Sequence, residues 1–77
     1  MNRELVIVDR REYLKTLDKL DISKVAHIEF KVAGLSSICY IDKESHLLLA
    51  QSLYFPAGIN EYRINRQFKE NECDISQ

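Results

Sequence analysis

Cys39 and His46 are the two residues whose chemistry could make this chain an enzyme. A thiol becomes a nucleophile when a nearby base takes its proton, and histidine often serves as that base. In the strand pairing expected from the sequence, their Cα atoms lie roughly 7 to 8 Å apart on one sheet face. No oxyanion site or orienting carboxylate can be assigned beside them, and an unpaired cysteine within an apolar strand is typical of a small core residue. We therefore predict no catalytic residue and no enzyme.

Metal and cofactor chemistry lacks its usual sequence patterns. The side chains that could bind zinc are Cys39, Cys73, His27 and His46. No two of them have the close spacing from which structural zinc sites are built. With only two glycines in the chain, no glycine-rich loop can hold a phosphate. We predict neither a metal site nor a cofactor.

Length, charge and cysteine usage limit the class of protein. The chain has 77 residues, with 11 basic and 12 acidic side chains, so it forms one small domain and has no charge excess that would attract a polyanion. Its longest apolar runs are far shorter than the ~20 residues that span a bilayer. The two cysteines lie far apart and the first residues do not resemble a secretory signal. We expect a cytoplasmic protein with no membrane partner.

The apolar pattern predicts a strand, a helix and then four strands. Residues 5–8 are mostly β-branched, which favours a short strand. Asp9 with Glu12 three positions later has the form of a capping box, and apolar residues then recur at helical spacing over residues 10–20. Strict alternation at 26–32 and apolar runs at 37–41 and 46–55 predict three more strands.

Residues 60–68 can be interpreted in two ways. Tyr62, Ile64 and Phe68 alternate with polar residues, which predicts a fifth strand of the sheet. A helix from Asn60 onward is the alternative, because Ile64 and Phe68 are also four positions apart.

This order of elements is typical of an α+β protein. We predict a single domain over residues 1–68, in which an antiparallel sheet packs on one N-terminal helix, followed by a polar, flexible tail over residues 69–77. The first strand is expected to join the sheet through a crossover and to run parallel to its neighbour. The alternative is a small curled β-barrel.

Turn chemistry predicts which residues share a face of the sheet. A two-residue loop of Gly34 and Leu35 would pair Ala33 with Ser36. A turn centred on residues 43 and 44 would place Cys39 opposite Leu48. A three-residue loop at 56–58 would pair Phe55 with Ile59 and set Ala50 opposite Ile64. A register shift of one residue would send every side chain to the other face.

In these registers one face is almost wholly apolar, and the helix is expected to cover it: Ala26, Ile28, Phe30, Val32, Cys39, Ile41, Leu48, Ala50, Tyr62, Ile64 and Phe68. The second face has polar outer strands around a central stripe, consisting of Ile38, Tyr40, Leu47, Leu49, Leu53 and Phe55. One helix of about 16 Å cannot cover both faces. We predict that the central stripe binds a partner, with Glu61 and Arg63 as its polar rim. In the barrel alternative both apolar sets form the core.

The function expected from these features is binding rather than catalysis. We expect a small cytoplasmic protein-protein interaction module, a regulator, inhibitor or accessory subunit of bacterial, phage or mobile-element type, working as a homodimer or on another protein. The alternative is a sheet that binds single-stranded nucleic acid by stacking bases near Tyr40, Phe55 and Arg63. The net charge of -1 and the lack of an RNA-binding aromatic motif favour the protein partner.

Overall fold

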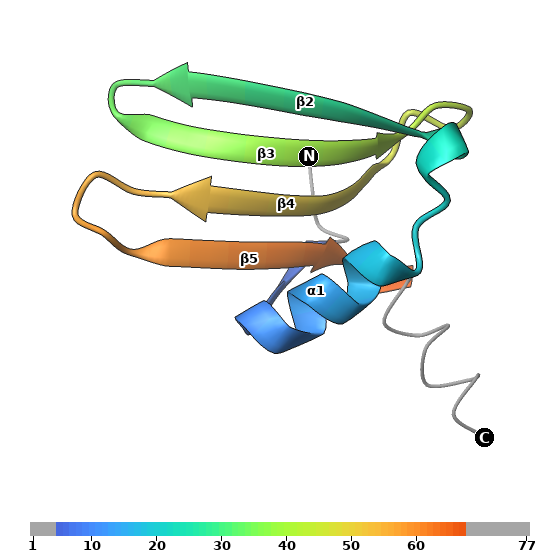
Figure 1. Ribbon diagram of the computed structural model, residues 1–77, viewed down its shortest axis with the longest axis horizontal. Coiled ribbons are helices and arrows are strands. Elements are labelled where there is room, and N and C mark those ends of the chain that lie inside the picture. Colours follow the sequence, from blue (N-terminus) through green and yellow to red (C-terminus); the bar gives the residue numbers. More distant parts are fainter. Residues whose placement is uncertain (1–4, 68–77) are drawn as a thin grey trace.

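The computed structural model describes residues 5–67, and it has one helix packed on a five-stranded antiparallel sheet (Figure 1). The elements in chain order are β1 (Leu5–Val8), α1 (Arg10–Asp18), the short 3-10 helix η1 (Ile22–Lys24), β2 (Val25–Val32), β3 (Leu35–Asp42), β4 (Leu48–Tyr54) and β5 (Asn60–Asn65). The strand order β1-β5-β4-β3-β2 gives an open sheet. The α+β prediction is therefore confirmed and the barrel alternative is wrong. The predicted tail at 69–77 lies outside the described residues.

The helix α1 begins where the sequence predicts it. The backbone N–H of Glu12 donates to Oδ1 of Asp9 at 2.8 Å, which satisfies one of the N–H groups left free at a helix start. The helix ends at Asp18, shortly before the predicted end, and the N–H of Lys19 still bonds back to the last turn. Tyr13 and Leu17, one turn apart, lie on the side that faces the sheet.

The core lies between α1 and the centre of the sheet. Tyr13 is 4% exposed, and beneath it Ala50 and Ile64 are fully buried and directly opposite each other on β4 and β5. The partly buried residues around them are Val6, Val8, Leu17, Tyr40 and Tyr62. The rings of Tyr13 and Tyr62 have centroids 4.9 Å apart. A small residue at position 50 leaves space for the Tyr13 ring over β4.

Two of the three predicted hairpins keep the predicted faces. The register of β4 with β5 is confirmed, because Phe55 N–H donates to Ile59 O at 2.9 Å and Ala50 lies opposite Ile64. Between β2 and β3 the turn is centred on Ala33 and Gly34, both with positive φ (51° and 83°), as a type I′ turn requires. Val32 therefore pairs with Leu35. This displacement is even, so each side chain stays on its expected side.

The register of β3 with β4 is different, and it reverses the faces. Cys39 lies opposite Gln51 rather than Leu48, and Tyr40 lies opposite Ala50. The pairing is displaced by three positions, which is an odd number. The prediction of which β2 and β3 residues share a face with which β4 and β5 residues is therefore wrong. The apolar side of β2 and β3, which was expected under α1, lies on the opposite face.

The cause of this displacement is the structure of the loop between β3 and β4. Oδ2 of Asp42 accepts from the backbone N–H of Ser45 at 2.7 Å and from its hydroxyl at 2.8 Å. His46 adopts a φ of 65°, and its N–H bonds to Asp42 O at 2.8 Å. The loop is thus wider than a two-residue turn, and an irregularity follows at Tyr40 and Ile41. Such an irregularity in one strand bends it and breaks the simple alternation.

Both edges of the sheet bear on the remaining predictions. The strand β1 pairs antiparallel with β5, through Leu5 with Asn65 and Val8 with Tyr62, so the predicted parallel neighbour is wrong. The chain crosses from β1 over the sheet to β2 at the opposite edge.

Residues 60–65 form a strand, and the alternative helix from Asn60 is wrong. Oδ1 of Asn65 accepts from the N–H of Gln67 at 2.9 Å, which is typical of a residue preceding a helical turn. Phe68 lies outside the described residues.

We predict that Tyr13 makes the fold sensitive to alkaline pH. Burial raises the pKa of Tyr13 to about 12, while an unfolded tyrosine ionises near pH 10. Between those pH values the unfolded chain holds fewer protons than the folded one, so stability falls as the pH rises. Between pH 9 and pH 11 the wild type should lose about 1 kcal/mol more unfolding free energy than Tyr13→Phe. Denaturant titrations at both pH values measure this, and equal losses in the two proteins would contradict it.

Candidate functional site

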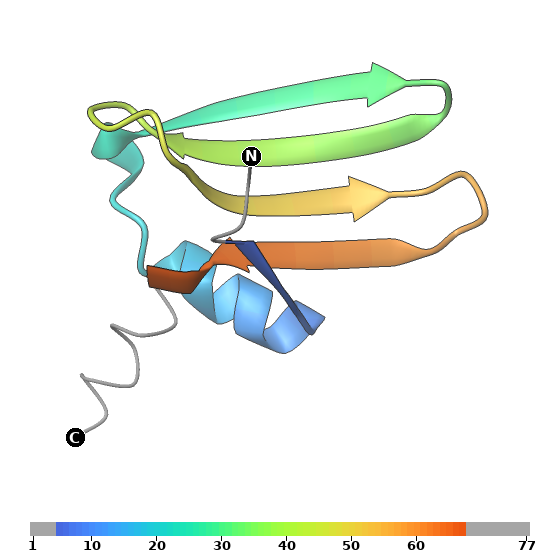
Figure 2. The same ribbon diagram turned by 180° about the vertical axis from the view of Figure 1, so that it is seen from behind.

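The helix α1 covers only part of one side of the sheet. Figure 1 shows it beside β5, and it packs on β5 and β4, with Tyr13 and Leu17 on its inner side. Figure 2 shows the same sheet from behind, where no helix lies over the strands that the structure describes. We call this rear side the open face. On the helix side, β2 and the outer part of β3 are also without a covering helix.

The structure separates the residues of the predicted central stripe. Ile38 and Tyr40 lie on the helix side, because Tyr40 is opposite Ala50 and packs against the core under α1. Leu49 and Leu53 lie on the open face and are each 8% exposed. The predicted rim residues, Glu61 and Arg63, lie on the open face as well, where Glu61 is opposite Leu53. Leu47 and Phe55 flank β4 outside the strand itself.

A row of exposed apolar side chains on the open face comes from β2. Ile28, Phe30 and Val32 are 46%, 44% and 61% exposed and follow one another at every second position, so they share one side of the strand. Their cross-strand neighbours on β3 are Cys39, Ser37 and Leu35 in that order. At the other edge of the same face, Ile7 of β1 is exposed beside Arg63. We call Ile28, Phe30 and Val32 the β2 strip.

The middle of the open face holds Leu53 together with polar side chains that bond to one another. Gln51 Nε2 donates to Ser37 Oγ at 3.1 Å, and that hydroxyl donates to the backbone carbonyl of Ser52 at 3.1 Å. Arg63 forms an ion pair with Glu61. These bonds satisfy the polar groups beside the β2 strip, so the strip has a polar border on the side of β4 and β5.

The nucleic-acid alternative depended on three residues that the fold does not bring together. Tyr40 is on the helix side, Phe55 follows the end of β4, and the guanidinium of Arg63 is bonded to Glu61. A base-stacking surface needs its rings and its cation on one face. The structure provides no such group of these three residues.

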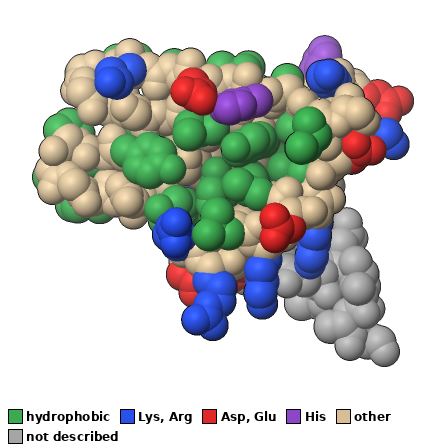
Figure 3. Space-filling model, viewed as in Figure 1, with side chains coloured by type: hydrophobic (Ala, Val, Ile, Leu, Met, Phe, Trp, Pro, Cys, Tyr) green, Lys and Arg blue, Asp and Glu red, His purple; other side chains and the backbone are tan. Residues whose placement is uncertain are grey.

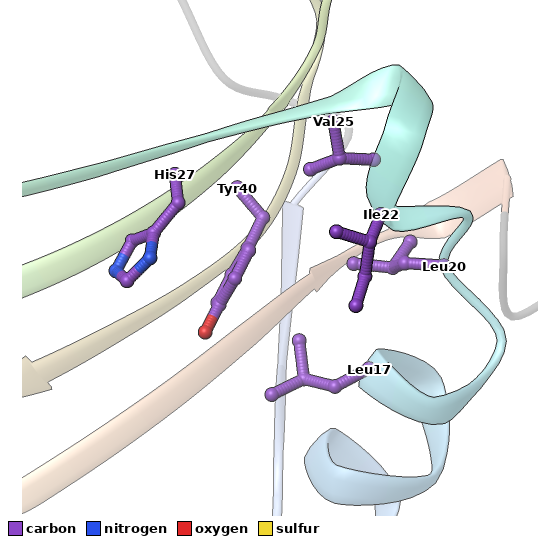
Figure 4. Close-up of a pocket in the computed structure, with 6 residues that line it drawn as sticks. All are labelled: Leu17, Leu20, Ile22, Val25, His27 and Tyr40. Carbon is purple, nitrogen blue, oxygen red and sulfur yellow. The ribbon is translucent and has the colours of Figure 1, made fainter.

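A pocket of about 320 Å³ lies on the helix side, between the end of α1 and β2. Figure 4 shows its lining side chains, which are Leu17, Leu20, Ile22, Val25, His27 and Tyr40. The rings of His27 and Tyr40 stack with centroids 5.2 Å apart, and His27 Nε2 lies 2.9 Å from Glu29 Oε2. Figure 3 shows apolar side chains gathered in the middle of this side of the molecule. Such a lining suits an apolar or aromatic group more than a charged one.

Sequence reasoning missed this pocket because it depends on the β3 and β4 register. His27 and Tyr40 are cross-strand partners on β2 and β3, and the regular alternation of both strands places them on one face. What the sequence did not indicate is that this face is the one that α1 covers. The signal that could have revealed it is Tyr40, because a large ring opposite Ala50 can fill space beside the helix.

The residues considered for catalysis do not form a site. Cys39 is a free thiol and is 8% exposed, and its Sγ lies 3.8 Å from Ser37 Oγ. Its cross-strand neighbours are Ile28 and Gln51, whereas His46 is in the exposed loop before β4. Among residues 5–67 no three His, Cys, Asp or Glu side chains are grouped as metal ligands would be.

The geometry of the described residues offers surfaces for binding, and the comparisons add no assignment. No helix in the described part of the chain is long and apolar enough to cross a membrane. Comparison with protein-family models, with curated proteins and with solved structures finds no match. Function must therefore be inferred from the surfaces of this chain.

We predict that Cys39 is chemically inert in the folded protein. The thiol is only 8% exposed, so a reagent in solution has little access to it in the folded protein. A small alkylating reagent should therefore modify Cys39 at least about tenfold more slowly in the native protein than in denaturant. Peptide mapping by mass spectrometry reports on Cys39 separately from Cys73. Fast, selective modification of native Cys39 would contradict the prediction and revive an enzymatic role.

Proposed function

We propose that this protein is a small interaction module that acts by binding another protein through its open face, and that it works as a homodimer. The observation that carries the proposal is the β2 strip, in which three large apolar side chains are exposed side by side. Single exposed apolar residues are common on protein surfaces, but a contiguous row bordered by polar groups is typical of an interaction site.

The strip is a modest source of binding energy. Burying a large apolar side chain completely contributes about 1.5 to 3 kcal/mol. Ile28, Phe30 and Val32 are already about half buried, so docking on the strip contributes about 3 kcal/mol. A micromolar complex needs about 8 kcal/mol. A partner must therefore use further contacts, such as the ion-paired rim of Glu61 and Arg63 or free backbone groups at the sheet edge.

The setting that we propose is the cytoplasm, where the module would serve as a regulator, inhibitor or accessory subunit. Cys39 is a free thiol, which suits a reducing compartment. The cross-strand neighbours of Cys39 are Ile28 and Gln51, neither of which can act as a base, and this supports a role in binding rather than in chemistry. The partner is expected to present an apolar surface with a polar border that complements the strip.

The test compares two apolar residues of similar exposure. Ile28 is 46% exposed on the open face, and Leu14 is 41% exposed on α1, on the other side of the molecule. Ile28→Ser should lower the amount of partner protein that the tagged chain captures from its source cells by about fivefold. Leu14→Ser should leave the captured amount unchanged. Circular dichroism confirms that both variants are folded.

Two results would contradict this proposal. One is equal capture by wild type, Ile28→Ser and Leu14→Ser. The other is an equal loss with both variants, which would show general stickiness instead of a defined face.

A further inference from the structure

The outer edge of β2 is a second unpaired feature beside the β2 strip. This strand stands at the end of the sheet order and has 8 residues, whereas β1 at the opposite edge has 4. Because a two-residue turn joins β2 to β3, Val32 and Leu35 form a hydrogen-bonded pair, and alternate residues of β2 bond to β3. The N–H and C=O groups of His27, Glu29 and Lys31 therefore point outward. No other strand of residues 5–67 pairs with them.

Of the features that usually prevent edge pairing, this edge has only the charged side chains of Glu29 and Lys31. Proteins protect exposed strands with proline, bulges, inward charges or short length. The strand β2 contains no proline and pairs with β3 without any register shift. Its charged residues all lie on the helix side, and the open side is apolar. Such an edge can accept one more antiparallel strand.

We propose that the edge of β2 pairs with β2 of a second copy of this chain, antiparallel, with the two-fold axis at Phe30. In this register Glu29 lies opposite the partner's Lys31, and the symmetry makes this pair twice. On the open side Phe30 lies opposite its own copy, and Ile28 lies opposite the partner's Val32. All three residues of the β2 strip thus lie opposite strip residues of the second copy, and Glu29 and Lys31 lie opposite residues of the other charge.

Other registers are less favourable, including the one centred on Lys31, which would place two lysines opposite each other. Centring the pair on Glu29 would place that carboxylate opposite its own copy, and like charges directly opposite destabilise a sheet. Centring it on Ile28 would pair His27 with the partner's Glu29 but would leave Val32, which is 61% exposed, outside the apolar contacts. Only the Phe30 register satisfies both sides of the strand.

The resulting dimer has one continuous sheet of ten strands, twice the five of each copy. The strips of both copies meet at the junction and form one wider apolar row on a common open face. The hydrogen bonds at Glu29 and Lys31 supply the contacts that the strip alone lacks. This inference rests on the proposed function in one respect, because it specifies the homodimer named there.

The test uses charge reversal at the two facing positions. Glu29→Lys places two lysines opposite each other at each site, and Lys31→Glu places two glutamates there. Each variant alone should raise the dimer Kd by about tenfold. An equimolar mixture of the two variants restores opposite charges at both sites, so it should return to the wild-type Kd as a heterodimer. Sedimentation equilibrium over a concentration series measures these constants.

Two matched controls change net charge without touching the edge. The controls are Glu44→Lys, at an exposed position in the loop after β3, and Lys15→Glu, at an exposed position on α1. Both should dimerise like wild type. Glu29→Gln distinguishes the registers. It removes the attraction to the partner's Lys31 in the Phe30 register, which weakens that dimer. In the Glu29 register it removes the repulsion between two Glu29 carboxylates, which strengthens that dimer.

The outcomes separate this inference from the proposed function. A wild type that stays monomeric, a dimer unaffected by the reversals, or a dimer tightened by Glu29→Gln would each overturn the β2 pairing. If partner capture still depends on Ile28 in any of those cases, the open face remains a binding surface without the edge dimer. Weakened single variants with a restored mixture would support the pairing.

Discussion

The width of sheet that α1 covers is the constraint on which the rest of this structure depends. Figure 1 shows α1 lying roughly along β5, so it covers a width of about 10 Å, whereas five strands spaced about 4.8 Å apart make a sheet about 19 Å wide. The helix therefore closes one core, in which Tyr13 packs over Ala50 and Ile64. The hairpin of β2 and β3 lies beyond its reach, and this hairpin holds both the β2 strip and the unpaired edge. The incomplete cover of the sheet and the proposed binding function have the same origin.

The sequence predicted the elements well because their signals are local. Asp9 caps α1 as expected, and the short loop before Ile59 sets the β4 and β5 register through one backbone bond. The β3 and β4 register could not be predicted in the same way. It depends on the Asp42 carboxylate, which holds Ser45, and on the positive φ of His46. Neither residue type demands that loop, and a displacement of three residues there exchanged the faces of the sheet.

The sequence predicted the type of candidate site, an uncovered apolar face of the sheet, but not the residues that form it. The sequence indicated that one helix would leave an apolar face uncovered, and an open face with exposed apolar residues is present. Its members changed because β2 alternates regularly, with Ile28 and Phe30 on one side and Glu29 on the other. That pattern does not specify which side meets a helix. Tyr40, expected on the uncovered side, instead packs beside the core, and only the long-range pairing with Ala50 decides this.

The central claim is that β2 lacks a neighbour which a second copy supplies. Residue-resolved amide hydrogen exchange at low and high protein concentration tests this most directly, because the N–H groups of Glu29 and Lys31 point outward in the single chain. We predict that these two amides exchange quickly in dilute protein and become protected as the concentration rises, while the inward amides of Ile28 and Phe30 are protected throughout. Exchange at Glu29 and Lys31 that is fast at every concentration would contradict the account.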